Sequence, residues 1–268
     1  MNIFLFSVDL EDIRFRTKDG MKYAERLPAL THQYLEFLDK HKVKCTFFTV
    51  GDVAEKYPTL IGEIYRRGHE IACHSASHIE LHQMTKEQFR DDTKKNMNAL
   101  YNAGVKEIFG YRAPAFSLTE KTQWAYEVLE QLGIKYSSSV LPAKNPLNGW
   151  KGFGKEPKRI GNILEIPMNI SSFWRKAIPF SGGVYFRTLP FFMIRNAFQK
   201  TFENKKPVLG YFHPYDIDTK QERFMHPGIN EKSFYNFLMY YNRRNVFSRL
   251  EKIMQHCTII RYCDYVKE

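Results

Sequence analysis

The chain has 268 residues, of which 43% are hydrophobic and 15% aromatic, so it can bury a sizeable core and does not have the composition of a disordered chain. Forty Lys and Arg residues against 29 Asp and Glu give a formal net charge of +11, which favours anionic partners, but no basic run predicts nucleic-acid binding. The four cysteines form no CxxC motif, which argues against a zinc-knuckle or dithiol redox site.

The first residues, MNIFLFSVDLED, form a short apolar run that lacks a basic start and is followed at once by acidic residues. This pattern is unlike a signal peptide and predicts a first β-strand. No apolar run approaches the roughly 20 residues that a transmembrane helix needs. We therefore expect a cytoplasmic protein, and its basic charge leaves room for peripheral association with a membrane surface.

Strand and helix patterns then alternate along the chain up to residue 140. Strands are predicted at 2–9, 43–51, 69–74, 108–114 and 134–140, and helices at 26–42, 53–68, 85–104 and 119–133. Thr85 and Thr119 are candidate helix caps, and Gly68, Gly104 and Gly133 stand where helices are expected to stop. This alternation is typical of βα units and predicts an α/β fold around a parallel sheet.

The remainder of the chain is less regular. Residues 142–190 are rich in Pro, Gly, Asn and aromatic residues, which predicts an irregular insertion. A late strand at 207–218, a helix near 231–255 and a final strand within 257–266 complete the expected elements. Because no linker, repeat or low-complexity segment divides the sequence, we expect one domain over residues 1–268.

Polar residues with catalytic or metal-binding chemistry follow four of the predicted strands. They are Asp9, Glu11 and Asp12; His74 and His78; Arg112; and His213. In parallel α/β barrels the carboxyl ends of the strands form one face, which carries the active site. The sequence therefore predicts that these four clusters converge.

The chemistry of these residue types suits metal-assisted hydrolysis. Two imidazoles, such as His74 and His78, together with a carboxylate suit zinc or a similar divalent ion. A second carboxylate can then act as the general base toward water. Arg112 precedes Ala-Pro in an extended segment and can orient that base, and His213 at a strand end can protonate a leaving amine.

The motifs resemble those of a known family. SVDLED, HEIACHSASH, GYRAPAF and YFHPYDID occur in the order found in the polysaccharide deacetylase family, carbohydrate esterase family 4, and the resemblance runs from about residue 3 to residue 225. The segments SGGVYFRTLP and YFHPYDIDTKQER resemble the subset with a DxED first motif that is found in bacterial exopolysaccharide gene clusters. The resemblance implies a distorted (β/α) barrel of about seven parallel strands. It also implies a metal-dependent hydrolase that removes an N-acyl group, usually acetyl, from an amino sugar in a polysaccharide or lipid-linked glycan.

The resemblance also implies a role for each motif residue. Asp9 matches the family's base, Arg112 the arginine that braces it, and His213 the general acid. His74 and His78 match the two histidine ligands of one divalent metal ion, for which Zn²⁺ is the first choice and Co²⁺, Ni²⁺ or Mn²⁺ are alternatives.

The sequence departs from the family pattern at two positions. Leu10 stands where the family has a second aspartate, so the metal carboxylate must be Glu11 or Asp12. Side-chain alternation along a strand places Glu11 on the face of Asp9 and favours it, whereas an earlier strand end would leave Asp12 open. Ser137 stands where relatives often have Asp, which removes an auxiliary hydrogen bond.

Substrate contacts are expected around the arginine motif. Tyr111, Pro114 and Phe116 are the predicted substrate-binding residues, and Trp150, Trp174 and Tyr185 are further candidates for stacking against a sugar. Two other functions stay open from the sequence: an amidohydrolase of the same fold that acts on a small non-sugar amide, and a non-catalytic carbohydrate-binding relative.

Overall fold

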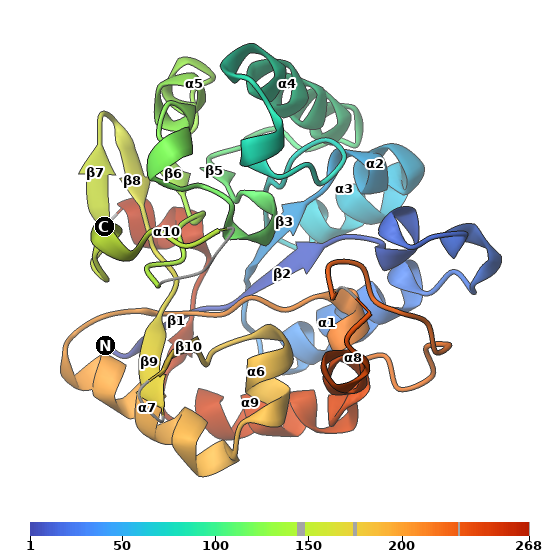
Figure 1. The fold of residues 1–268 in the computed structure, drawn as a ribbon, viewed down its shortest axis with the longest axis vertical. Helices are drawn as coiled ribbons and strands as arrows, with labels where there is room; N and C mark the ends of the chain where they lie inside the picture. The colour runs from blue at the N-terminus through green and yellow to red at the C-terminus, as the bar shows by residue number, and fades with distance from the viewer. Residues whose placement is uncertain (144–147, 174–175, 230, 268) are drawn as a thin grey trace.

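The fold is a distorted barrel of parallel strands surrounded by helices, as the sequence predicted (Figure 1). The computed structural model describes residues 1–143, 148–173, 176–229 and 231–267. Its main sheet has the order β2-β3-β4-β5-β6-β8-β7, in which every neighbouring pair is parallel except β7 with β8. These strands are β2 (Ser7–Leu10), β3 (Thr46–Thr49), β4 (Glu70–Cys73), β5 (Gly110–Tyr111), β6 (Tyr136–Ser137), β7 (Lys158–Ile160) and β8 (Ile163–Glu165).

The first predicted strand is divided in two because it changes partners along its length. Its first part, β1 (Ile3–Leu5), lies between β11 (Val208–Leu209) and β12 (Thr258–Ile259), and all three are parallel. Beyond Phe6 the chain continues as β2, which pairs with β3 on one side and forms a parallel bridge from Val8 to Phe212 on the other. The late strand that carries His213 therefore runs beside the strand that carries Asp9.

In the described residues the side chain of Asn169 links the far edge of the main sheet to β11. It accepts a hydrogen bond from Leu209 N at 2.6 Å and donates one to Pro207 O at 3.2 Å. A small antiparallel sheet of β9 (Ile170–Phe173) and β10 (Lys176–Pro179) follows Asn169. The distortion of the barrel is thus located between β8 and β11, within the segment that the sequence predicted to be irregular.

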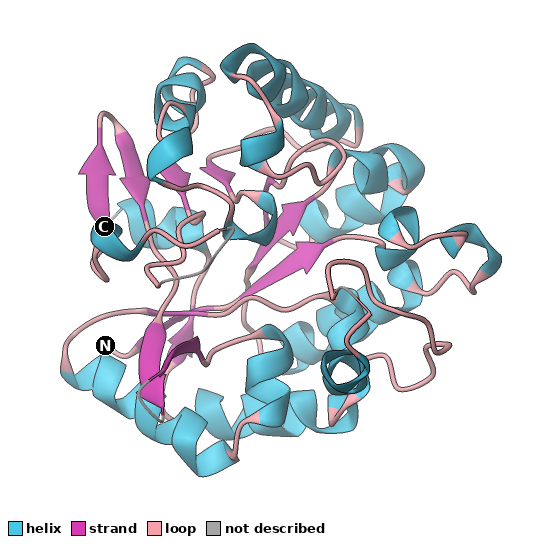
Figure 2. Ribbon diagram, in the orientation of Figure 1, coloured by secondary structure: helices cyan, strands magenta, loops and turns pink. Residues whose placement is uncertain are grey.

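Helices surround the strands (Figure 2). They are α1 (Leu27–Lys40), α2 (Gly51–Lys56), α3 (Pro58–Arg66), α4 (Lys86–Asn102), α5 (Ala125–Gln131), α6 (Gly183–Thr188), α7 (Phe191–Glu203), α8 (Ser233–Tyr240), α9 (Val246–Met254) and α10 (Tyr262–Lys267). In the ranges that the structure describes, no helix combines the length and the apolar character that crossing a membrane requires.

Several helix boundaries follow from local chemistry. Thr85 caps α4 through a reciprocal capping box with Gln88, and Gly68 and Gly104 adopt φ of +84° and +93° after the helices they end. The predicted helix over 53–68 is two helices, because Pro58 has no N–H and restricts the residue before it.

The second half holds more helix than the sequence predicted. Helix α7 forms over a stretch to which no element was assigned. The predicted helix near 231–255 is α8 and α9, separated at Asn242, whose φ is +59°. The final strand is only two residues long and leads into α10.

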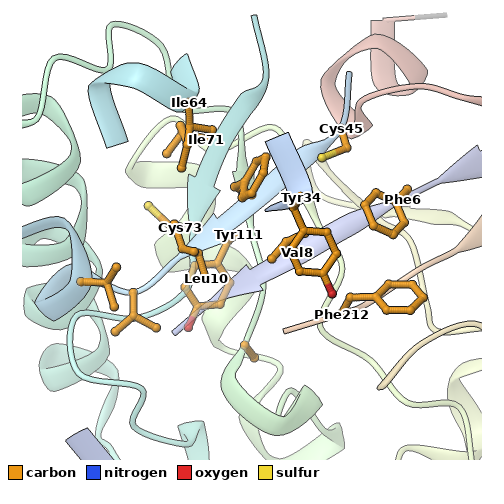
Figure 3. Close-up of a cluster of buried hydrophobic side chains, with 14 of the residues drawn as sticks. Phe6, Val8, Leu10, Tyr34, Cys45, Ile64, Ile71, Cys73, Tyr111 and Phe212 are labelled. Atoms are coloured by element: carbon orange, nitrogen blue, oxygen red, sulfur yellow. The ribbon is translucent and has the colours of Figure 1, made fainter. Parts of the chain in front are cut away.

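Side-chain alternation along the first strand decides what faces the barrel interior. Phe4, Phe6, Val8 and Leu10 point outward and pack with the helices in the main core, part of which is drawn in Figure 3. Leu5 points inward and joins a smaller cluster with Phe48, Tyr136 and Tyr262 among others. Asp9 lies on the inward face of the same strand, so its carboxylate is directed into the carboxyl end of the barrel.

Candidate active site

The carboxyl ends of four strands meet around one cavity of about 450 Å³. Five of the residues that the sequence singled out line it: Asp9, Glu11, His74, His78 and His213. Asp9 lies within β2, His74 directly follows β4, and His213 follows β11. The parallel register of these strands accounts for the convergence of residues that are up to 204 positions apart.

Glu11, His74 and His78, which we call the ligand group, could hold a metal ion. One ligand atom from each lies within 4.8 Å of those of the other two. His74 Nδ1 donates to the backbone oxygen of Arg112 at 2.8 Å, which turns the Nε2 lone pair toward the cavity. Burial lowers the pKa of His74 to about 4, so the imidazole is neutral, as a metal ligand must be.

The carboxylate of Glu11 is the acidic member of this group. Its Oε2 atom is 2.9 Å from His78 Nε2 and 2.6 Å from Arg16 Nη2, yet within the described residues it has no partner of hydrogen-bond geometry. Burial raises the pKa of Glu11, but Arg16 and His78 outweigh burial and hold it well below the ordinary value. An ionised, buried oxygen directed at an imidazole nitrogen fits a divalent cation.

Asp12 faces away from the ligand group. It is the N-cap of a short 3₁₀ turn, Ile13–Arg16, where its carboxylate accepts from the backbone N–H of Arg14. The Arg14 guanidinium closes a bidentate pair with it, through Nε at 3.0 Å and Nη2 at 2.6 Å. Of the two acidic residues that the sequence left open, Glu11 is therefore the one placed to bind a metal.

Asp9 is held by Arg112, which is fully buried. Arg112 Nη1 donates to Asp9 Oδ1 at 2.5 Å and to Ser7 Oγ at 2.7 Å. The other donors of the guanidinium reach Ser138 and the hydroxyl of Tyr262. Burial would lower the pKa of Arg112, but Asp9 and other neighbours raise it above the ordinary value, so the guanidinium stays charged.

His213 has a second buried arginine behind it. His213 Nδ1 is 3.0 Å from Asp216 Oδ2, and Arg187 Nε donates to the other oxygen of Asp216 at 2.9 Å. Burial alone would lower the pKa of His213, but Asp216 raises it above the ordinary value. The ring of Tyr215 is stacked on His213, with centroids 4.6 Å apart and planes 8° apart.

Comparisons with known proteins agree with this geometry. A family model described as polysaccharide deacetylase matches residues 18–137, a range that includes His74, His78 and Arg112. Nearly half of the chain is thus similar to the polysaccharide deacetylase family. A second model, described as a domain of unknown function (DUF3473), matches residues 138–267, where His213 lies. The first strand, with Asp9 and Glu11, precedes both matched ranges.

The curated relatives of this chain, which are named as deacetylases, are similar to it over part of their length. It is 34% identical over 101 residues to a peptidoglycan-N-acetylglucosamine deacetylase of Bacillus cereus, which is 36% of each protein. It is 39% identical over 54 residues to a chitooligosaccharide deacetylase of Sinorhizobium fredii, which is 20% of this chain and 25% of that protein. The chain thus spans well under half the length of these relatives.

Solved structures share the fold over nearly the whole chain. A protein of Mycobacterium smegmatis proposed to be a polysaccharide deacetylase superposes with a TM-score of 0.62 at 18% identity, covering 99% of this chain and 88% of that one. PuuE allantoinase superposes with a TM-score of 0.57 at 13% identity, covering 99% and 89%. At these identities the superpositions show the fold alone.

The predicted substrate-binding residues of the deacetylase motif differ in where they lie. Phe116 lines the cavity, and so does Tyr185. Tyr111 does not: its side chain is fully buried in the main core, against Phe89, on the outer face of β5 (Figure 3). Period-2 alternation explains this difference from the expectation, because the neighbouring Arg112 takes the inward face. Pro114 is buried and is not part of the cavity wall.

A further aromatic candidate, Trp150, does not line the cavity. Trp150 is stacked edge-on against Phe153 and packs on the main core. Trp174 lies outside the described residues.

The tight loops around the cavity hold His78, Ala115 and Phe116 at φ between +52° and +56°. Non-glycine residues rarely adopt these conformations, which cluster at functional sites.

Sequence reasoning missed several residues of the site. Tyr211 and Tyr215 line the cavity on either side of His213, and the pattern YFHPY could have revealed them. Arg16 also lines the cavity, but nothing in its sequence context indicates this. Arg187 lies in the segment predicted to be irregular, and no local signal points to it.

The replacement at Ser137 leaves a different polar support in place. Ser137 Oγ donates to Ser139 Oγ at 2.7 Å, and Ser139 Oγ accepts from the backbone N–H of Ala113 at 2.8 Å. The buried carboxylate of Glu165 accepts from Ser139 N at 2.7 Å. These bonds tie the segment after Arg112 to the neighbouring strands without a carboxylate at position 137.

Proposed function

We propose that this chain is a metal-dependent hydrolase that removes an N-acyl group, in the first instance N-acetyl, from an amino sugar within a glycan. One observation carries the proposal: Asp9 and His213 flank the ligand group in a single cavity. Asp9 Oδ2 is 4.0 Å from His74 Nε2, and His213 Nε2 is 3.9 Å from Glu11 Oε1. A base and an acid on either side of a cation site are what amide hydrolysis requires.

Glu11, His74 and His78 would hold the metal ion. Two imidazoles and one carboxylate suit Zn²⁺ first, and Co²⁺, Ni²⁺ or Mn²⁺ as alternatives. When bound, such an ion polarises a carbonyl oxygen and lowers the pKa of water.

Asp9 would act as the general base. Its Oδ1 is engaged by Arg112, which leaves Oδ2 on the cavity side to accept a proton from the attacking water. The buried guanidinium fixes the carboxylate in one orientation. The water oxygen forms the new bond to the amide carbon.

His213 would act as the general acid. Because Asp216 can only accept at His213 Nδ1, the Nδ1 position carries a proton, and the raised pKa of His213 favours a second proton on Nε2. That Nε2 proton passes to the nitrogen of the leaving amine as the amide C–N bond breaks. The products are a free amino sugar and a carboxylate.

The cavity walls support a sugar substrate. Phe116, Tyr185, Tyr211 and Tyr215 contribute aromatic surface to the cavity, and aromatic faces suit the apolar faces of pyranose rings. The two relatives described above are named as deacetylases of peptidoglycan N-acetylglucosamine and of chitooligosaccharide. The DxED resemblance adds a bacterial exopolysaccharide, or its lipid-linked precursor, as the proposed setting.

The test is acetate release by the purified protein from N-acetylglucosamine oligomers, set against a panel of cyclic amides. We expect release from the oligomers, loss of release after chelation, and recovery on adding Zn²⁺ or another divalent ion. Preference for a cyclic amide would favour a small-amide hydrolase of the same fold. Binding of the oligomers without release would favour a non-catalytic relative.

A matched pair of variants tests the proposed ligand group. We expect Glu11→Gln to lose the metal and the activity, whereas Asp12→Asn keeps both, because the Asp12 carboxylate is occupied by Arg14. Metal content per protein is the readout. Full activity in a metal-stripped His74→Ala protein would contradict the proposed mechanism.

A further inference from the structure

Helix α8 and the residue directly after it present four aromatic side chains to solvent. Phe234, Phe237 and Tyr241 recur at the spacing of one helix face, and Tyr235 lies beside them; we call these four residues the α8 ridge. Their exposed fractions are 67%, 55%, 47% and 56%, respectively. Four large aromatic side chains side by side form an exposed apolar patch of the kind that marks an interaction site.

The opposite face of α8 is polar and is turned toward the protein. Asn236 accepts from the backbone N–H of His226 and donates to Phe224 O, both at 3.0 Å. One turn later the hydroxyl of Tyr240 accepts from Phe224 N and donates to Phe224 O, again at 3.0 Å. The helix is therefore anchored by hydrogen bonds on its polar face, which fixes the α8 ridge in the outward orientation.

A basic hollow adjoins the α8 ridge. It has a volume of about 420 Å³ and includes Tyr241 in its wall. Its charged lining residues are four basic ones, Lys220, Arg223, Arg243 and Arg244, and one acidic one, Asp218, whose carboxylate is paired with Arg26. Residues 219–244 contain five basic and two acidic residues. Lys232, at the start of α8, extends over the ring of Tyr235, with its nitrogen 5.9 Å from the ring centre.

The α8 ridge also adjoins the candidate active site. Helix α8 contacts α6, and the two lie together in Figure 1. On α6, Tyr185 lines the cavity and is 36% exposed. Helix α6, which contributes Tyr185 to the cavity wall, is thus in contact with the helix that carries the ridge. Whatever covers the α8 ridge is therefore held close to the cavity mouth.

We propose that the α8 ridge and the basic hollow form a docking surface for an anionic phospholipid bilayer. The aromatic rings would enter the boundary between headgroups and acyl chains, and the hollow would receive a lipid phosphate. Two Phe rings without a polar edge suit a bilayer better than a glycan. In a symmetric pair of copies, the same basic residues would face each other and repel, which disfavours a second copy as the occupant.

Binding of the α8 ridge to a bilayer does not depend on the proposed chemistry. Only its consequence for access to the substrate rests on the proposed function. If the chain acts on a glycan, docking of the α8 ridge would bring the cavity next to glycans that are attached to lipid in the same bilayer. A substrate carried on an anionic lipid would then be reached at the membrane surface.

Vesicle co-sedimentation of the full chain tests the docking surface. We expect binding to phosphatidylglycerol vesicles, weak binding to phosphatidylcholine vesicles, and release by high salt. Phe234→Ser combined with Phe237→Ser should weaken the partition by about tenfold or more. The matched control is Phe192→Ser on α7, which removes a phenylalanine of similar exposure, 61%, and should bind as the unaltered chain does.

Four outcomes would overturn the proposal. They are no binding to phosphatidylglycerol vesicles, equal binding to phosphatidylcholine vesicles, equal losses in the ridge and Phe192 variants, or a ridge-dependent dimer in place of vesicle binding. Urea unfolding of each variant serves as the folding control, and the exposed side chains should leave its midpoint unchanged. Loss of vesicle binding with acetate release from soluble oligomers retained would separate docking from the catalytic proposal.

Discussion

The two halves of the chain each place one buried arginine behind a residue that lines the cavity, and the two arginines are anchored differently. In the first half, Arg112 holds Asp9 directly, and its other bonds go to residues that follow strands or face the barrel interior. In the second half, Arg187 holds His213 only through Asp216, and its Nη1 donates to the carbonyl oxygens of Leu238 and Tyr241. The Asp9 carboxylate is thus braced by residues of the barrel, and His213 is braced through residues of a surface helix.

The two arginines also differ in what their loss would leave without a partner. Among the described residues, Arg112 alone donates hydrogen bonds to the Asp9 carboxylate, so the loss of that arginine leaves a buried charge without a partner. Asp216 also accepts from the backbone N–H and ring of His213, so it keeps partners without Arg187. Within the described residues, Arg187 Nη2 is itself buried without a hydrogen-bond partner. Removing Arg112 should therefore cost more free energy of unfolding than removing Arg187.

The largest effect on rate is expected from Asp9→Asn. The amide keeps an oxygen for Arg112 but cannot accept a proton, so kcat should fall by about 10³-fold if Asp9 is the base. Metal content should not change, because Asp9 lies outside the ligand group. Steady-state acetate release and metal analysis on the same sample are the measurements. A fall of less than tenfold with metal retained would remove Asp9 from the proposed role.

The next effect concerns stability and compares the two braces directly. Arg112→Met should lower the free energy of unfolding by about 3–5 kcal/mol, because it strands the buried Asp9 carboxylate. Arg187→Met should cost less, because Asp216 keeps two bonds to His213. Urea unfolding of both metal-free variants measures the difference, since a bound ion would partly neutralise Asp9. Equal losses would show that the two braces do not differ as described.

A smaller effect is expected in the pH profile of kcat, through His213 and Asp216. Asp216 raises the pKa of His213 against the effect of burial, so Asp216→Asn should let that pKa fall. His213, as the proposed general acid, must be protonated to act, so kcat should decline as pH rises through the pKa of His213. The basic limb of the kcat profile should therefore move to lower pH, with a loss of about tenfold near pH 7.5 for a shift of about one unit. An unmoved limb would mean that another group sets it.

The strand periodicity accounts for how much of the site could be predicted. Parallel strands put Asp9, His74 and His213 at one end of the sheet, and this follows from the position of each residue in its strand. Glu11 lines the cavity, as the alternation indicated, and Arg14 holds the Asp12 carboxylate by a local ion pair. The choice of Glu11 as the metal ligand stays a prediction. The same alternation, applied to Tyr111, would have directed it outward once Arg112 was taken to face inward.

The second half resisted prediction for a different reason. Periodicity shows which residues share a helix face but not whether that face points inward. The aromatic residues of α8 have the spacing that is also typical of a helix in a hydrophobic core. Its outward orientation depends on Asn236 and Tyr240 bonding to a loop that precedes it. Arg187 is likewise placed by contacts with residues 29 to 54 positions away, which no local pattern records.

The smallest predicted effect concerns the point where the two halves meet in the cavity wall. Phe116 from the first half and Tyr211 from the second are in edge-on contact, with ring centroids 5.3 Å apart, and both line the cavity. If they form one sugar-binding wall, Phe116→Leu and Tyr211→Leu should each raise KM for N-acetylglucosamine oligomers by about threefold to tenfold with kcat nearly unchanged. Because each ring supports the other, the double variant should lose less than the product of the two single effects. Multiplicative losses would show that the two aromatic rings bind substrate independently, and a loss in kcat would place one of them in the chemistry rather than in the wall.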